Sequence, residues 1–286
     1  MGDEALVPDF RARYGPWAVV AGASEGIGAE LARRIAAAGV HVVLLARRAG
    51  PLEALATELR DAHGVEVRAV TVDLTSPDVL DHVLAAAGDV EVGLLVYNAG
   101  AVHGAELFTR RPVQDALGLV DLNCRSVVLL THELGGRMAA RGRGGMVLMT
   151  SMSSAAGAGY TAVYNATKAF DLVLAEGLWM ELGQFGVDVI AVPAGLTDTP
   201  AMRSSGIIGD DGPAMSSADV ASAALGALGV SGPVVVPGEG NRNVAGFLWP
   251  VDRGTLVRAL TDGATSLYDR PPIPTPGTGH DSRSSA

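Results

Sequence analysis

Lysine is almost missing from this chain of 286 residues. Of its 21 cationic side chains, only Lys168 is not an arginine. Arginine serves wherever a solvated positive charge is needed, so a single lysine indicates a position that requires a compact ammonium on a flexible stem. Lys168 follows Tyr164 by four residues. On a helix this spacing brings both side chains to one face, so the two residues form a candidate site.

Cysteine and net positive charge are also scarce. Cys124 is the only cysteine, which excludes an intrachain disulfide and is typical of a reducing cytosol, so we expect a cytoplasmic protein. The formal net charge of −10 argues against nucleic acid or an anionic membrane surface as the main partner. The six histidines show no metal-ligand spacing, and no metal site is expected.

Long apolar runs are absent as well. No window reaches the roughly 18 apolar residues of a membrane span, and the opening segment MGDEALVPDF lacks the apolar core of a signal peptide. Hydrophobic residues make up 48% of the chain, which suits one large α/β domain. We expect a leader over 1–14, a catalytic domain over 15–240, a helical extension packed on it over 241–270 and a disordered tail over 271–286.

Apolar segments of strand length alternate with amphipathic segments of helix length. A helix is expected from the glycine loop after the first strand to about residue 38, and further helices are expected over 77–87, 112–140 and 160–184. The expected strands are 17–21, 41–45, 66–71, 94–97, 146–150, 187–192 and 234–236. This alternation predicts a parallel sheet covered by helices on both faces, as in doubly wound Rossmann-type folds.

A glycine-rich loop follows the first expected strand. It contains Gly22, Gly26 and Gly28, with Ser24 and Ile27 between them, and a helix begins behind it. Glycines leave room for backbone to approach a pyrophosphate, and a helix N-terminus offers free N–H groups to its charge. The alternative is a tight turn with no ligand.

The ends of the next strands offer groups for a dinucleotide. Arg47 and Arg48 follow the second strand, where a cation accommodates the 2′-phosphate of NADP and an acid would bind the ribose of NAD. They could instead be solvated loop charges, and Glu25 puts a negative charge nearby. Asp73 either bonds adenine or caps the following turn. Asn98 and Gly100, at the end of the fourth strand, suit the floor of a nucleotide cleft; the alternative is a structural turn.

Tyr164, Lys168 and Ser151 together suit proton transfer at a carbon–oxygen centre. A neighbouring ammonium favours the phenolate form of a tyrosine, which makes it usable as an acid or base. Ser151, expected at the end of the fifth strand, adds a hydroxyl that can hold a carbonyl or alcohol oxygen. The alternative is a surface tyrosine and lysine on an amphipathic helix.

The segment 193–217 lacks clear periodicity. An irregular stretch of this length inside a compact domain is usually functional or disordered. Its apolar residues among glycines suggest a lid over an apolar substrate, formed by Met202, Ile207, Ile208 and Met215.

These motifs resemble the short-chain dehydrogenase/reductase family over roughly residues 15–240. The resemblance rests on AGASEGIG at 21–28, Asn98-Ala99-Gly100, Asn123, Ser151 and YNATK at 164–168. Residues 14–28 are more narrowly similar to hydroxysteroid dehydrogenases and long-chain 3-ketoacyl reductases. The resemblance implies a seven-stranded parallel sheet and a nicotinamide cofactor. Arg47 and Arg48 favour NADP(H) as this cofactor, and NAD(H) is the alternative.

The family resemblance also implies residue roles. Tyr164 would be the acid or base, Ser151 would hold the substrate oxygen, and Lys168 would bind the nicotinamide ribose. Asn123 would hold a water in the proton relay. Further cofactor contacts would come from Leu74, Ala99 and Thr199. Ala21 and Tyr97 stand where the family more often has threonine and asparagine.

We expect an oxidoreductase that moves hydride between NADP(H) and a ketone or secondary alcohol with an apolar body. An NAD-linked alcohol dehydrogenase and a non-catalytic nucleotide-sensing or scaffold protein are the alternatives. Family members are commonly dimers or tetramers built on the long helices, so a homodimer or homotetramer is expected.

Overall fold

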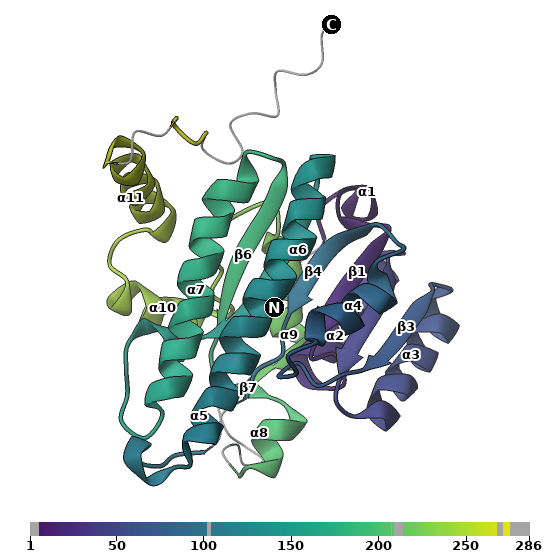
Figure 1. Ribbon diagram of the computed structural model, residues 1–286, viewed down its shortest axis with the longest axis horizontal. Coiled ribbons are helices and arrows are strands. Elements are labelled where there is room, and N and C mark those ends of the chain that lie inside the picture. The colour runs from purple at the N-terminus through teal and green to yellow at the C-terminus, as the bar shows by residue number, and fades with distance from the viewer. Residues whose placement is uncertain (1–5, 102–103, 207, 209–213, 268–270, 275–286) are drawn as a thin grey trace, which may run out of the picture.

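A six-stranded parallel sheet forms the centre of the molecule (Figure 1). The computed structural model describes residues 6–101, 104–206, 208, 214–267 and 271–274. The strand order is β3-β2-β1-β4-β5-β6, so the direction of winding reverses between β1 and β4. Open α/β sheets bind ligands at this reversal, beside the carboxyl ends of the strands. The strands are β1 (Trp17–Ala21), β2 (His41–Ala46), β3 (Val67–Thr71), β4 (Val92–Tyr97), β5 (Gly144–Ser151) and β6 (Val187–Ala194).

Helices cover both faces of this sheet because successive residues of each strand point to opposite sides. Ala18 and Val20 of β1 belong to the core cluster under α2 (Gly26–Ala37), α3 (Ala49–His63) and α9 (Ser217–Ala227). Val19 and Ala21 belong to the second cluster, under α4 (Val79–Ala87), α6 (Ser126–Arg141) and α7 (Ala162–Gly183). The doubly wound fold predicted from the sequence is therefore confirmed.

The seventh expected strand, at 234–236, is reduced to a single parallel bridge between Ala191 and Val234. The Ala191 N–H donates to Pro233 O over 2.8 Å, and the Val235 N–H donates to Ala191 O over 2.9 Å. These residues thus extend the β6 edge without forming a regular strand.

The helix expected over 112–140 is interrupted. It consists of α5 (Val113–Val120), a π-helical turn (Asp121–Arg125) and α6. The segment 193–217 contains more regular structure than expected: a short pair of strands, β7 (Thr197–Asp198) and β8 (Met215–Ser216), encloses α8 (Pro200–Ser204).

The expected leader is packed into the domain. Helix α1 (Phe10–Tyr14) buries Phe10 and Tyr14 in the core cluster that contains Ala18 and Val20. The Tyr14 hydroxyl donates to Asp188 on β6 over 2.7 Å, and burial raises the pKa of Tyr14 well above its usual range. A domain boundary at residue 15 would cut through this packing, so residues 10–14 belong with the sheet.

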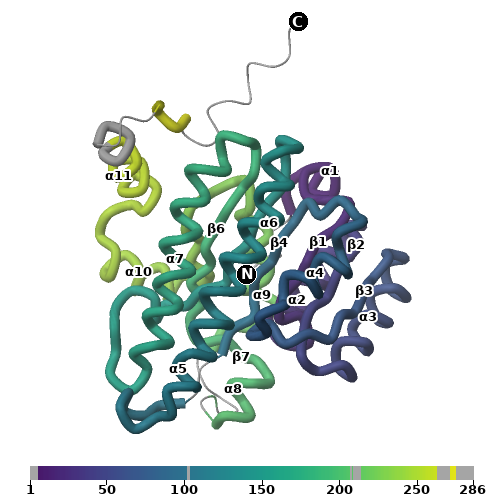
Figure 2. Tube along the Cα trace, viewed as in Figure 1, coloured from purple at the N-terminus to yellow at the C-terminus, as the bar shows by residue number. Residues whose placement is uncertain are grey.

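The C-terminal extension forms α10 (Glu239–Leu248) and α11 (Arg253–Leu267), which are separated near Pro250 as expected. Figure 2 shows both helices beside α7. The Arg253 guanidinium binds Glu176 of α7 through two bonds of 2.5 and 2.6 Å. Most of the expected tail, residues 275–286, lies outside the described residues.

Within the described residues, no helix combines the length and apolar character needed to cross a membrane. The cytoplasmic location expected from the sequence stays a prediction.

Candidate active site

The glycine loop packs against the ends of β1 and β4 too closely for larger residues. Gly22 has a φ of +80°, and a Cβ there would lie 2.7 Å from the backbone of Ala99. A Cβ on Gly28 would lie 2.1 Å from Gly22 O and 2.6 Å from Asn98 Nδ2. The same amide donates to Gly22 O over 2.9 Å. The loop and the floor of the cleft are therefore held together by direct contact.

The residues of this loop fit the diphosphate of a dinucleotide. Helix α2 begins at Gly26, and the side chain of its N-cap residue, Glu25, makes no capping bond. The first N–H groups of the helix are thus available to an anion. A Cβ on Gly26 would lie 3.0 Å from Thr199 Cγ2, so the loop faces the segment after β6. Ser24 and Ile27 lie in this loop and are half-buried.

The two arginines after β2 differ in their contacts. Arg48 binds Glu25 over 2.5 Å, which ties it to the glycine loop. Arg47 is exposed, and its charge contributes to the lowered pKa of Asp73. The main cause of that lowered pKa is the Thr75 N–H, which donates to Asp73 Oδ1 over 2.9 Å. Asp73 therefore caps its turn, one of the two roles considered from the sequence.

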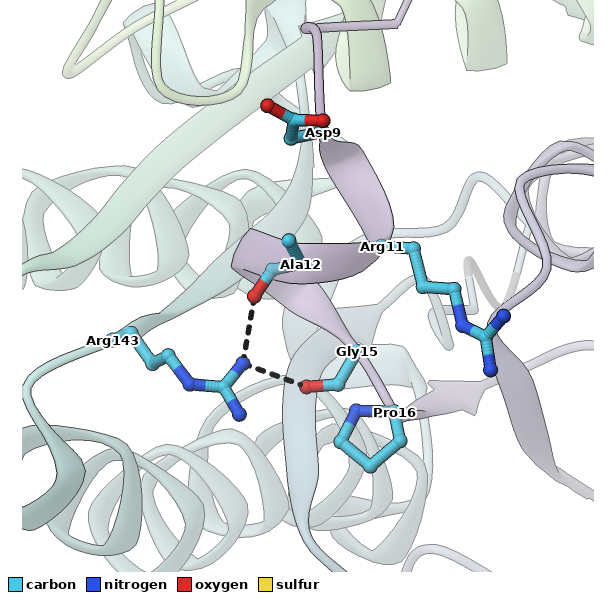
Figure 3. A pocket seen from close by; sticks show the side chains of 6 residues that line it. All are labelled: Asp9, Arg11, Ala12, Gly15, Pro16 and Arg143. Carbon is cyan, nitrogen blue, oxygen red and sulfur yellow. Dashed lines mark hydrogen bonds between the residues drawn. The ribbon is translucent and has the colours of Figure 1, made fainter.

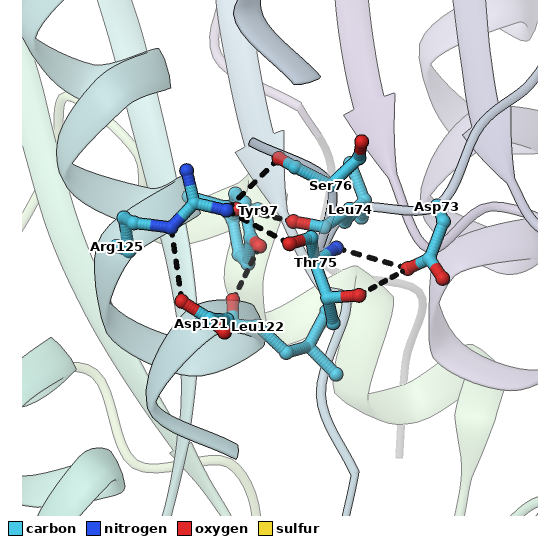
Figure 4. Close-up of polar contacts among 9 residues, drawn as sticks. Asp73, Leu74, Thr75, Ser76, Tyr97, Asp121, Leu122 and Arg125 are labelled. Atoms are coloured by element: carbon cyan, nitrogen blue, oxygen red, sulfur yellow. Dashed lines mark hydrogen bonds and ion pairs between the residues drawn. The ribbon is translucent and has the colours of Figure 1, made fainter. Parts of the chain in front are cut away.

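The loop after β3 is tied to the π-helical turn (Figure 4). Arg125 donates to Thr75 O over 2.8 Å and to Ser76 O over 2.9 Å. The Tyr97 hydroxyl donates to Leu122 O over 2.6 Å. Ser126 donates to the main-chain oxygen of Leu74, whose side chain is buried in the core. These contacts connect the edge of the cleft to the turn that carries Asn123.

Asn123 and Lys168 converge on Gly100. Both side chains are buried, and a Cβ on Gly100 would lie 3.3 Å from Lys168 Nζ and 3.7 Å from Asn123 Oδ1. Asn123 Nδ2 donates to Thr167 Oγ1 over 3.0 Å, whereas Oδ1 has no partner among the described residues. A π-helical turn often occurs at a functional site, and this one aims a polar side chain at the cleft.

Ser151 and Tyr164 stand half-buried on two elements that are bonded together. Ser151 ends β5, and its Oγ accepts the Ser153 N–H over 3.1 Å. Thr150 Oγ1 donates to Lys168 O over 2.6 Å. Asn165 Nδ2 donates to Ala156 O over 2.8 Å. The serine and the first turns of α7 are thereby fixed relative to each other.

The ammonium of Lys168 has a partner that the sequence analysis missed. It donates to Asp171 Oδ2 and to Met149 O, both over 3.0 Å. Among the described residues it makes no hydrogen bond to Tyr164. Burial raises the pKa of Asp171 to about 6, against the attraction of Lys168. An acid three residues after the single lysine was the available signal, because residues at i and i+3 on a helix are neighbours.

An apolar cavity of about 500 Å³ adjoins Tyr164. It is lined by the loop after β4, by α5 and by the start of α7, including Leu107, Phe108, Leu119 and Val163. Of the four proposed lid residues, Met202 and Ile208 are neighbours, since the Ile208 N–H donates to Met202 O over 3.5 Å. Their role as a lid stays a prediction. Met202 is half-buried, Ile208 is buried, and Ile207 lies outside the described residues.

Met215 is half-buried on β8. It packs against the core cluster, and its sulfur accepts a bond from Asn241 Nδ2 over 3.4 Å. In the pairing of β8 with β7, Met215 lies opposite Thr197.

A second hollow lies before the amino ends of β1 and β5 (Figure 3). Arg143 extends across it and donates to the main-chain oxygens of Ala12 and Gly15 over 2.8 and 3.2 Å. Its guanidinium is used to fasten α1 to the sheet. The chemistry-bearing residues lie at the opposite edge.

The glycine loop, a serine, a tyrosine and a buried lysine agree with the class that the comparisons show: an NAD(P)-dependent oxidoreductase that acts on alcohols and ketones. A family model described as short chain dehydrogenase matches residues 16–206, and the chain belongs to the short-chain dehydrogenase/reductase family.

Proteins similar to this chain agree with the narrower resemblance. The 7beta-hydroxysteroid dehydrogenase of Collinsella aerofaciens is 31% identical over 197 residues, which are 69% of this chain and 74% of that protein. A very-long-chain 3-oxoacyl-CoA reductase of Laccaria bicolor is 32% identical over 183 residues, or 63% and 54% of the two chains. The solved structure of a short-chain dehydrogenase from Sphingobium yanoikuyae in complex with NADPH has a TM-score of 0.74 and 32% identity, covering 90% of this chain and 96% of that one.

The Gly28→Ala variant tests the cradle. Its Cβ would collide with a backbone oxygen 2.1 Å away, which no side-chain rotation can relieve. We expect NADPH binding, followed by nicotinamide fluorescence, to weaken at least about tenfold, with a stability loss of about 1–3 kcal/mol. Gly136→Ala on α6 is the control because a Cβ there meets nothing within 4 Å. Wild-type affinity in Gly28→Ala would contradict the packing argument.

Proposed function

We propose that this protein is an NADP(H)-dependent reductase of ketones with an apolar body, which also works in the direction of alcohol oxidation. The observation that supports the proposal is the bond from Thr150, the neighbour of Ser151, to the main chain of Lys168 on the helix that also carries Tyr164. Lys168 adjoins Gly100 at the floor of the cleft, and Tyr164 borders the apolar cavity. Each element of this arrangement has a defined task in carbonyl chemistry.

The bound nicotinamide supplies the hydride to the carbonyl carbon. Tyr164 donates a proton to the carbonyl oxygen, and Ser151 donates a hydrogen bond that stabilises the negative charge developing there. Lys168 would hold the ribose of the cofactor. Asn123 would hold a water molecule that passes a proton back to Tyr164 after the reaction. In alcohol oxidation the same groups work in reverse.

The cavity supports a substrate with a large apolar body. Its walls include Leu107, Phe108, Leu119 and Val163, and Tyr164 lies at its border. A pocket of this composition gains affinity by removing apolar surface from water. The names of the relatives point the same way, since a hydroxysteroid and a very-long-chain acyl group are both large and apolar.

Tyr164→Phe is the central test of the reaction. With NADPH and a panel of bulky ketones, we expect kcat to fall by at least about a hundredfold because the proton donor is lost. NADPH affinity should stay within about twofold. Tyr160→Phe is the matched control, since it removes a hydroxyl from the same cavity wall. Unchanged turnover in Tyr164→Phe would refute the assignment, and wild-type protein that binds cofactor but reduces no ketone would favour the non-catalytic alternative.

Arg47 supports the preference for NADP(H) over NAD(H). It is exposed at the end of β2, whereas Arg48 is already bound to Glu25. Among the described residues Arg47 has no ion pair to give up, so its guanidinium is the better partner for the 2′-phosphate, which it can bind with two donors.

Arg47→Ala should therefore weaken NADPH binding by about tenfold or more and leave NADH binding unchanged. Arg48→Ala should have the smaller effect. Fluorescence titration of each variant with both cofactors measures the difference. Equal losses of affinity for NADPH and NADH would show that the arginines do not bind the 2′-phosphate and would favour the NAD-linked alternative.

We also propose that the protein forms a homodimer or homotetramer through the helices on the α7 face. Figures 1 and 2 show α5, α6 and α7 side by side. Their solvent-facing surface carries large apolar side chains that are exposed: Val113, Leu117, Val120, Val128, Phe170 and Val173. An accumulation of exposed apolar side chains on adjoining helices supports an interface there.

Sedimentation velocity should give at least a dimer for the wild type. The double variant Phe170→Arg and Val173→Arg should be a monomer, because buried unpaired charges would oppose association. Phe247→Arg on α10 should not alter the mass, since Phe247 is exposed outside this face. A monomeric wild type would rule the proposal out.

A further inference from the structure

Asp171 forms a buried ion pair with the single lysine of the chain. It lies three residues after Lys168 on α7, and the two side chains are 2% and 6% exposed. Lys168 Nζ lies 3.0 Å from Asp171 Oδ2 and 3.0 Å from the main-chain oxygen of Met149 on β5. An ammonium has three donors, so two of them are directed into the protein.

Gly100, at the floor of the cleft, lies directly beside the ammonium of Lys168. A Cβ there would lie 3.3 Å from Nζ, which is closer than an ordinary van der Waals contact. Gly100 follows the end of β4, where the strand order reverses and a ligand is expected. The third donor of Lys168 is therefore the one that remains for a ligand in the cleft.

Neither charge is stable at this depth without the other. Removing one partner of a buried ion pair leaves an uncompensated charge, which the remaining side chain escapes by moving or neutralising. The Asp171 carboxylate is thus the group that compensates the ammonium at this depth.

Asp171 is also the group here that changes charge near neutral pH. Burial raises its pKa to about 6, so the carboxylate, and with it the ion pair, is lost as the pH falls below that value. The other titratable groups that face it are Lys168, Tyr97 and Cys124. Burial raises the pKa of Cys124 to about 11 and that of Tyr97 further, so both stay neutral at physiological pH.

We propose that Asp171 is a positioning residue for Lys168. Its carboxylate fixes the ammonium against Met149 O, so that one N–H stays directed at the ribose of the nicotinamide cofactor. The ribose contact rests on the proposed function, whereas the positioning of the ammonium does not.

The single lysine permits a direct test without cofactor or substrate. Protein with an isotopically labelled lysine side-chain nitrogen, and a lysine-free tag, gives one ammonium signal in the NMR spectrum. We expect this signal to shift as the pH passes through about 6 in the wild type, and to show no such transition in Asp171→Asn. The same titration in both proteins would overturn the proposal.

Cofactor affinity tests the consequence for binding. NADH is the probe, because the 2′-phosphate of NADPH itself titrates near pH 6. Asp171→Asn should bind NADH about tenfold more weakly at about pH 8, with little further change at about pH 5, whereas the wild type should weaken by a similar factor between these values. Wild-type affinity and pH dependence in Asp171→Asn would contradict the proposal.

Glu176→Gln is the matched control. It removes another buried carboxylate from α7, one that binds Arg253 rather than Lys168. Its NADH affinity and pH dependence should match those of the wild type. A loss equal to that of Asp171→Asn would mean that any buried charge on this helix has the same effect, and the specific role would fail.

A double-mutant cycle separates positioning from general destabilisation. In Lys168→Met protein, changing Asp171 to Asn should weaken NADH binding no further, because a positioning residue acts only through the lysine. Additive losses would overturn the proposal. If the single variant Asp171→Asn does not fold, Lys168→Met is compared with the double variant Lys168→Met and Asp171→Leu, in which apolar side chains replace the ion pair. The NADH affinities of these two proteins should be equal. Wild-type protein that binds neither cofactor would refute the proposed function, and the ammonium signal would then decide the role of Asp171.

Discussion

A buried positive charge must be compensated, and much of the active-site structure depends on how Lys168 meets this requirement. Its ammonium lies where α7 crosses the carboxyl end of β5, between the Met149 oxygen and the Asp171 carboxylate. Thr150, one residue later on β5, donates to the Lys168 main-chain oxygen and fastens the same crossing. Tyr164 stands one helical turn before the lysine, and Ser151 follows Thr150. Holding the charge in place therefore also fixes the elements that carry Tyr164 and Ser151, the two groups proposed to contact the reacting oxygen.

Close backbone packing is the second constraint, and it forms the cofactor side of the cleft. Gly22 and Gly28 allow the loop after β1 to touch the loop after β4, and Gly100 allows that loop to reach the ammonium. Close packing at the three glycines thus links the glycine loop to Lys168. The contacts of Arg125 extend the linkage to the loop after β3. A change at one end of the cleft is expected to alter the other.

The sequence predicts the sheet well because parallel strands buried on both faces are continuous apolar runs. All six strands start and end within two residues of the predicted positions. It does not predict the π-helical turn around Asn123, since one extra residue in a turn leaves no clear trace in the apolar pattern. The packing of Phe10 and Tyr14 depends on contacts with strands far along the chain. The pairing of Arg48 with Glu25, and of Lys168 with Asp171, likewise depends on side-chain direction, although both acids were visible in the sequence. The motifs identify the residue types, and the structure assigns their partners.

Hydride transfer itself is the most direct measure of the account. The wild-type protein would be incubated with a bulky apolar ketone and NADPH deuterated at the reactive carbon of the nicotinamide ring, and the product analysed by mass spectrometry and NMR. The account predicts that each alcohol molecule carries one deuterium on its carbinol carbon. Tyr164→Phe should form at least about a hundredfold less of this labelled alcohol in the same time. Cofactor that binds in the cleft but transfers no deuterium to any ketone in the panel would contradict it.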